Sequence, residues 1–183
     1  MTNYADAVFT IERLQLTVDV LSNLELQPGQ FDMTWYGGIG TCGITACPVG
    51  WTAQDPRAHA LGFKLVVVDG KHAGTKRLTP QLDPGKPDVP FPQGWLAVVY
   101  FYGISKATFD WLFTEEGYTY RPLAEVGARV TLDSYGIARD YVMECEVVDD
   151  YRNITVDRVV SRCKELIKAL QTIQDVNRVD ASI

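Results

Sequence analysis

The chain has 183 residues, a net charge of −6 and 46% hydrophobic residues, which is the composition of a folded globular protein rather than a disordered one. No run of lysine or arginine stands out, so we do not expect nucleic acid as a partner. The first ten residues lack the basic start and apolar core of a signal peptide, and no apolar run approaches the ~20 residues that span a bilayer. We therefore expect a cytoplasmic protein without membrane association, whose four cysteines are reduced.

The first predicted element is a helix over residues 11–24. Ile11, Leu14, Val18 and Leu21 recur at spacings of three and four, which places them on one helix face. Thr10 is the expected N-cap of this helix.

A second helix is expected around the cysteine- and glycine-rich stretch 42–51. Small residues recur along 43–54 at helical spacing, so a neighbouring backbone could approach this face closely: Gly43, Ala46, Gly50 and Ala53. Pro48 is tolerated only in the first turn of a helix. Either the helix starts near Cys47 or residues 42–46 form a separate turn, and we favour the later start.

Two strands and a connector follow. Residues 63–68 are rich in β-branched side chains, and residues 76–79 can pair with them as a hairpin. Residues 80–94 contain five prolines, which predicts a connecting segment without a helix or central strand. Residues 95–102 are apolar on all sides, so periodicity leaves open whether they form a buried helix or a strand.

The rest of the chain is predicted to hold two helices that flank a β-rich segment. Ser105 is the expected N-cap of a helix that closes at Gly117. Segment 121–150 is expected to be an inserted β region, with candidate strands over 128–132 and 141–148. Thr155 is the expected N-cap of the last helix, which we expect to fray after Asp175. The predicted fold is a single α+β domain over 1–183, helix-rich, with a β-hairpin after the second helix and the β insertion before the C-terminal helix.

Four blocks of the sequence, taken in order, resemble a known family. They are Phe31-Asp32-Met33-x-Trp35, then Cys42-Gly43-x-Thr45-Ala46-Cys47-x-x-Gly50-Trp51, then 101–118 from Phe101-Tyr102-Gly103, and finally Ile154-Thr155-Val156-Asp157-Arg158-Val159. The chain is similar to small hypothetical proteins of bacteria and their phages that carry a C-G-T-x-A-C-x-x-G-W-A type motif. It departs from that motif at Ile44-Thr45, Pro48 and Thr52, and about residues 121–150 lie outside the resemblance. The resemblance implies a helix-rich intracellular protein, often phage-borne, and transfers no catalytic residue.

Three kinds of chemical site were considered in the sequence. A cysteine nucleophile would be Cys42, with His59 or His72 as its base, although buried structural thiols are commoner than catalytic ones. Zinc is not expected, because Cys42 and Cys47 are too far apart for the usual close pair. Residues 38–43 match G-x-G-x-x-G, but the flanking segments do not form a strand and crossover helix, so no cofactor is expected.

Aromatic residues next to glycines are the better indication of a binding surface. Trp35 and Tyr36 directly precede Gly37 and Gly38, and such side chains anchor protein interfaces or stack on purines. We expect Trp51, Phe101, Phe109 and Trp111 to lie in the core instead. The predicted function is a non-enzymatic intracellular binding protein, phage- or prophage-encoded, that sequesters a host protein, such as a defence component, or a small nucleotide-like ligand. The alternative is a cysteine-dependent hydrolase or transferase that uses Cys42.

Overall fold

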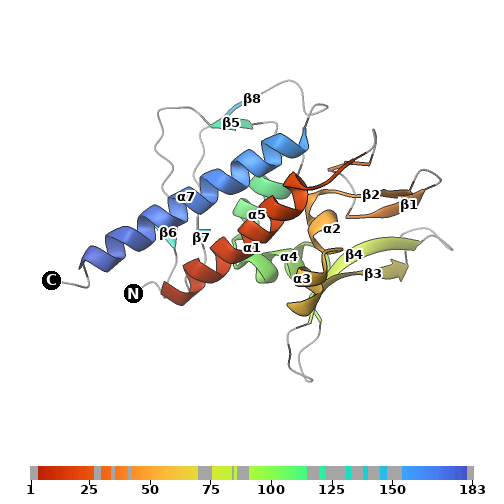
Figure 1. Ribbon diagram of the computed structural model, residues 1–183, viewed down its shortest axis with the longest axis horizontal. Coiled ribbons are helices and arrows are strands. Elements are labelled where there is room, and N and C mark those ends of the chain that lie inside the picture. The colour runs from red at the N-terminus through yellow and green to blue at the C-terminus, as the bar shows by residue number, and fades with distance from the viewer. Residues whose placement is uncertain are drawn as a thin grey trace.

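The computed structural model describes residues 4–26, 30–33, 36–40, 43–69, 76–83, 85, 91–114, 120–122, 131–132, 138–139, 145–147 and 154–180. Within these ranges the chain forms six helices, and its strands pair only as two-stranded antiparallel sheets, which confirms the α+β class (Figure 1). None of the helices in the described ranges is long and apolar enough to cross a membrane.

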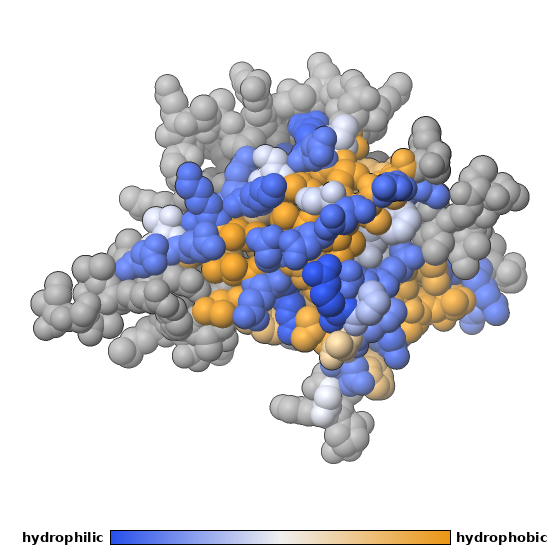
Figure 2. Space-filling model, viewed as in Figure 1, coloured by the Kyte–Doolittle hydropathy of each residue, from blue (hydrophilic) through white to orange (hydrophobic). Residues whose placement is uncertain are grey.

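Two long helices form the spine of the molecule. Helix α1 (Tyr4–Ser22) and helix α7 (Val156–Asp180) pack side by side and antiparallel, so the start of α1 and the end of α7 lie at the same end of the molecule (Figure 1). Apolar side chains fill the seam between them, and polar side chains cover their outer sides (Figure 2). The buried side chains of this seam come from both helices: Leu14, Val18, Leu21, Val159, Cys163, Leu166 and Leu170.

The ends of these two helices test three sequence predictions. Helix α1 begins at Tyr4, so Thr10 is not its N-cap; instead Thr10 is buried and its hydroxyl donates to the carbonyl oxygen of Gly103. Thr155 caps α7 as predicted, because its Oγ1 accepts the amide of Arg158 at 3.3 Å. Helix α7 continues to Asp180 rather than fraying after Asp175.

The cysteine- and glycine-rich stretch forms a short hairpin and then a short helix. Strands β1 (Gly38–Gly40) and β2 (Gly43–Thr45) pair, and helix α2 (Pro48–Thr52) starts just after Cys47 with Pro48 in its first turn. The later helix start that we favoured is therefore confirmed. A further helix, α3 (Pro56–Ala60), follows at once and was not predicted.

The predicted hairpin consists of strands β3 (Phe63–Asp69) and β4 (Lys76–Leu82), which pair antiparallel from Phe63 opposite Leu82 to Asp69 opposite Lys76. The segment after the hairpin lies along β4. The amide of Leu82 donates to Pro92 at 3.1 Å, and the amide of Gly94 donates to Pro80 at 2.8 Å.

Segment 95–102 is the helix α4 (Trp95–Tyr102), which ends at Gly103 in the left-handed conformation with φ +64°. Helix α5 (Lys106–Phe113) follows, and Ser105 caps it as predicted, because its hydroxyl accepts the amide of Thr108 at 3.1 Å. This helix ends at Phe113 rather than at Gly117. Stacked and edge-on rings of Phe63, Phe101, Tyr102 and Phe113 join both helices to the hairpin.

The expected β insertion is described only at four short strands. Strand β5 (Tyr120–Pro122) pairs with β8 (Cys145–Val147), and β6 (Thr131–Leu132) pairs with β7 (Ala138–Arg139). The candidate strands 128–132 and 141–148 contain β6 and β8, and their other residues lie outside the described ranges. Helix α7 follows these strands, as expected.

Candidate functional site

The predicted contact segment 35–38 is packed against the body of the protein where it is described. Tyr36 is half-buried, and burial raises the pKa of its hydroxyl well above the usual range. Gly37 is buried and faces Leu65 and Leu78 of the β3–β4 hairpin. Gly38 lies in β1, and Trp35 falls outside the described residues. Packing therefore accounts for Tyr36 and Gly37, and the prediction of a binding surface here stays a prediction.

The four small residues of the cysteine stretch do not form one helix face, because Gly43 lies in β2 and Ala46 precedes α2. Gly50 nevertheless makes the close approach to a neighbouring backbone that was expected. A Cβ atom built at Gly50 would lie 1.5 Å from the carbonyl oxygen of Tyr36, so only glycine fits beneath that backbone. Ala46 and Ala53 are fully buried beside it. This part of the motif is explained by packing between α2 and the segment before β1.

The described thiols are poor nucleophiles. Burial raises the pKa of Cys47 to about 11 and that of Cys163 to about 12, so both stay protonated at neutral pH. His59, one of the two proposed bases, lies on α3 with its Nε2 2.9 Å from the carbonyl oxygen of Ala53. Cys42 and His72 lie outside the described residues, so the proposed pairing of a thiol with a histidine stays a prediction.

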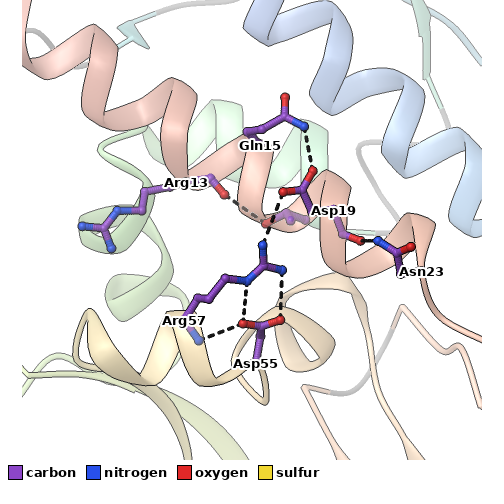
Figure 3. A network of polar contacts seen from close by, with 7 residues as sticks. Arg13, Gln15, Asp19, Asn23, Asp55 and Arg57 are labelled. Atoms are coloured by element: carbon purple, nitrogen blue, oxygen red, sulfur yellow. Dashed lines mark hydrogen bonds and ion pairs between the residues drawn. The ribbon is translucent and has the colours of Figure 1, made fainter.

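Cysteine, histidine and carboxylate side chains do not gather into a potential metal site in the described ranges. Those residues include no group of three or more that could hold an ion. A polar network on the surface instead joins two helices (Figure 3). The carboxylate of Asp55 accepts hydrogen bonds from Nε and Nη2 of Arg57 at 3.0 and 3.1 Å. The guanidinium of Arg57 also forms an ion pair with Asp19 of α1 at 3.4 Å. This network is exposed and its charges are paired, which is typical of a surface contact that joins α3 to α1.

A buried hydroxyl cluster lies where α1, α2 and α4 meet. The hydroxyls of Thr17 and Tyr102 are 2.6 Å apart, and the hydroxyl of Thr52 donates to Thr17 at 3.2 Å. Thr17 and Thr52 also face the backbone oxygens of Arg13 and Pro48. Each hydroxyl has a partner, and burial raises the pKa of Tyr102, so this cluster holds the helices together without a charge that could serve catalysis.

The described surface has one apolar feature that the sequence analysis missed. Helix α4 consists of aliphatic and aromatic residues alone, yet only one side of it is buried. The buried side chains on that side are those of Ala97, Val98, Phe101 and Tyr102. Its other side consists of Trp95, Leu96, Val99 and Tyr100, which we call the α4 face. Tyr100 is 59% exposed, Trp95 46% and Leu96 38%, while Val99 is half-buried. The absence of polar residues from 95–102 was the signal, but a fully buried segment has the same pattern.

One cationic group lies beside the α4 face, and a second lies against the buried side of the same helix. The ammonium of Lys106 stands 5.5 Å from the ring of Trp95 and forms an ion pair with Asp110 one turn further along α5. The guanidinium of Arg13 lies between the rings of Phe9 and Phe101, 4.5 and 4.7 Å from their centres. An exposed apolar surface with a charged pair at its margin, here Lys106 and Asp110, is the arrangement of a protein-binding surface.

Comparisons of the chain with protein families, with curated proteins and with solved structures find no match. The likeness to the C-G-T-x-A-C-x-x-G-W-A family therefore rests on the sequence motifs alone.

Proposed function

We propose that the protein is a non-enzymatic binding protein that holds a protein partner through the α4 face. The observation that carries the proposal is the exposure of Trp95 and Tyr100 on a helix without a polar residue. Leaving such side chains in water forgoes burial energy of about 1.5–3 kcal/mol for each large side chain. Tryptophan and tyrosine are also the residues that most often dominate the energy of an interface.

The shape of the α4 face indicates the kind of partner. Trp95 with Val99 and Leu96 with Tyr100 stand one turn apart, so the face is a short apolar ridge of two turns. A ridge of this kind fits an apolar groove on another protein. The net charge of −6 favours a groove with a basic rim. Phosphates need several cationic groups, whereas Lys106 beside Trp95 is already paired with Asp110, which supports a protein over a nucleotide-like ligand.

The sequence resemblance supplies the biological setting of the proposal. A chain similar to phage-borne proteins would be phage- or prophage-encoded, and its partner would be a host protein, such as a component of host defence. Binding at the α4 face would sequester or inhibit that protein without any reaction.

A photo-reactive amino acid in place of Tyr100 tests the proposal directly. In host cells it is expected to cross-link one protein, which is then purified for affinity measurements. Trp95→Ala and Tyr100→Ala are each expected to weaken binding about 30-fold, the loss typical of a central aromatic anchor. Leu61→Ala is the matched control, because Leu61 is exposed to a similar degree and stands at the end of α3, outside the α4 face. Unchanged affinity in both α4 variants would overturn the proposal.

A further inference from the structure

Strand β3 has an open edge. The amide of Asp83 donates to the carbonyl oxygen of Gly62 directly opposite it, which sets the hydrogen-bonding alternation along the β3–β4 ladder. By that alternation, the backbone amides and carbonyls on the side of β4 are those of Lys64, Val66 and Val68. The amides and carbonyls of Leu65 and Val67 point to the other side, where no described residue bonds to them. Figure 1 shows β3 on the outer side of the hairpin, away from β1 and β2.

The opposite edge of the same hairpin is paired over Pro80 to Leu82. Leu82 and Pro80 bond to Pro92 and Gly94 of the segment before α4. The backbone groups of Pro80 point away from β3. The amide hydrogen that proline lacks would therefore not have taken part in the β3–β4 ladder. Natural sheets commonly protect an open edge with proline, a bulge or charged side chains along it. Between Lys64 and Asp69, β3 has only apolar residues, and Val67 is 61% exposed.

Apolar side chains gather over this hairpin in Figure 2, so its edge combines unpaired backbone groups with an apolar surface. We infer that β3 pairs antiparallel with β3 of a second copy of this chain, to form a continuous four-stranded sheet across a two-fold axis. The two-fold axis places one residue opposite its own copy, and we place it at Val66, the middle of the strand. In this register Leu65 lies opposite Val67 of the second copy, so their outward backbone groups bond to each other.

The charges of β3 fit this pairing. In this register Lys64 lies opposite Val68 of the second copy, and Asp69 lies opposite Phe63. Unlike charges therefore share each end of the paired strands, although their side chains point to opposite faces of the sheet. Like charges are kept at opposite ends. A parallel arrangement would place the two lysines side by side, and the two aspartates as well. The pairing uses the backbone of β3 and no residue of the α4 face, so it does not depend on the proposed function.

The first test is the mass of the full chain in solution, measured by light scattering after gel filtration. Wild type is expected to have the mass of two chains. Val67→Pro is expected to have the mass of one, because it removes an outward amide that the β3–β4 ladder does not use. Val67→Thr keeps the amide and is expected to remain a dimer, as is Trp95→Ala on the α4 face. A circular dichroism melt checks that the proline variant is folded, and Val67→Lys replaces it if it is not. A monomeric wild type would overturn the inference, and so would a folded Val67→Pro or Val67→Lys variant that remains dimeric.

The second test reports the register. Residue 66 faces its own copy in a pair without mutual hydrogen bonds, where Cα atoms are about 4.5 Å apart and a disulfide can form. Val66→Cys is therefore expected to cross-link into dimers under mild oxidation. Lys64→Cys is the matched control, because the two copies of position 64 would be about 13 Å apart along the strands. Wild type controls for the native cysteines. Cross-linking of Lys64→Cys but not of Val66→Cys would overturn the proposed register.

Discussion

Gly50 of α2 lies directly beneath the carbonyl oxygen of Tyr36, closer than any side chain would allow. The contact joins the segment before β1 to the first turns of α2, and it brings Tyr36 beside the buried Cys47. It gives a physical reason for glycine at the end of the cysteine- and glycine-rich stretch. The reason is packing of one backbone on another, which requires no ligand.

Gly50→Ala is expected to destabilise the protein by about 3 kcal/mol or more, because the new methyl group meets a backbone atom that cannot move aside cheaply. Gly37→Ala is the matched comparison. Its Cβ would lie 3.0 Å from the end of the Leu78 side chain, which can rotate, so a loss of about 1 kcal/mol is expected. Urea denaturation measures both. Equal losses in the two variants would contradict the backbone contact at Gly50.

The hydroxyl cluster predicts an asymmetry between two conservative variants. Tyr102→Phe leaves Thr17 and Thr52 bonded to each other, so a loss of about 1 kcal/mol is expected. Thr17→Val removes the hydroxyl that bonds to both other members and leaves the Tyr102 hydroxyl buried without its main partner, for a loss of about 2 kcal/mol. Free energies of unfolding from urea titrations test the order of the two. A larger loss for Tyr102→Phe would show that the cluster is arranged differently.

The buried thiols predict a labelling pattern. Cys47 and Cys163 are 2% and 0% exposed, and their raised pKa values keep them protonated, so neither should react with a thiol reagent in the folded protein. In a Cys42→Ser, Cys145→Ser variant, both remaining thiols are expected to label only after addition of denaturant. Fast labelling of this variant in native buffer would contradict the core position of Cys47. The same assay on the single Cys42→Ser variant asks whether Cys42 accounts for the labelling of the wild type, as the alternative function requires.

Local signals in the sequence predicted several elements well. Ser105 and Thr155 cap their helices as expected, and Pro48 marked the true start of α2 because proline fits only the first turn. Asp55 followed by Pro56 is an equally good start signal, and it was overlooked because α3 is only five residues long. The true start of α1 was missed because the apolar stripe begins at Ile11, about two turns after the helix does.

Other features depend on contacts that no local pattern contains. The apolar run 95–102 left helix and strand open, although Gly103 at its end favours a helix C-cap. Which side of α4 is exposed is decided by where Phe63 and α1 pack against it, and these contacts come from distant parts of the chain. For the same reason the sequence pointed to Trp35 and Tyr36 as the contact surface and did not single out Trp95 and Tyr100 together.

The last prediction concerns acid stability. Asp55 caps α3 by accepting the amide of Arg57 at 2.8 Å, and the side-chain hydrogen bonds from Arg57 hold the pKa of Asp55 below its usual value. A carboxyl whose pKa is lower in the folded state stabilises the protein above the pKa of the unfolded chain, near 4. That contribution is lost as the pH falls through the lower folded value.

Two variants of Asp55 separate the cap from the charge. Asp55→Ala is expected to lose about 1 kcal/mol at neutral pH, because it removes the cap and the ion pair together. Asp55→Asn keeps a capping oxygen and should lose less, but its stability should fall less steeply than that of wild type between about pH 5 and pH 2. Thermal melts across that range measure the slope. An unchanged slope in Asp55→Asn would mean that other carboxyl groups dominate the acid response, and that Arg57 stabilises this corner through its bond to Asp19 alone.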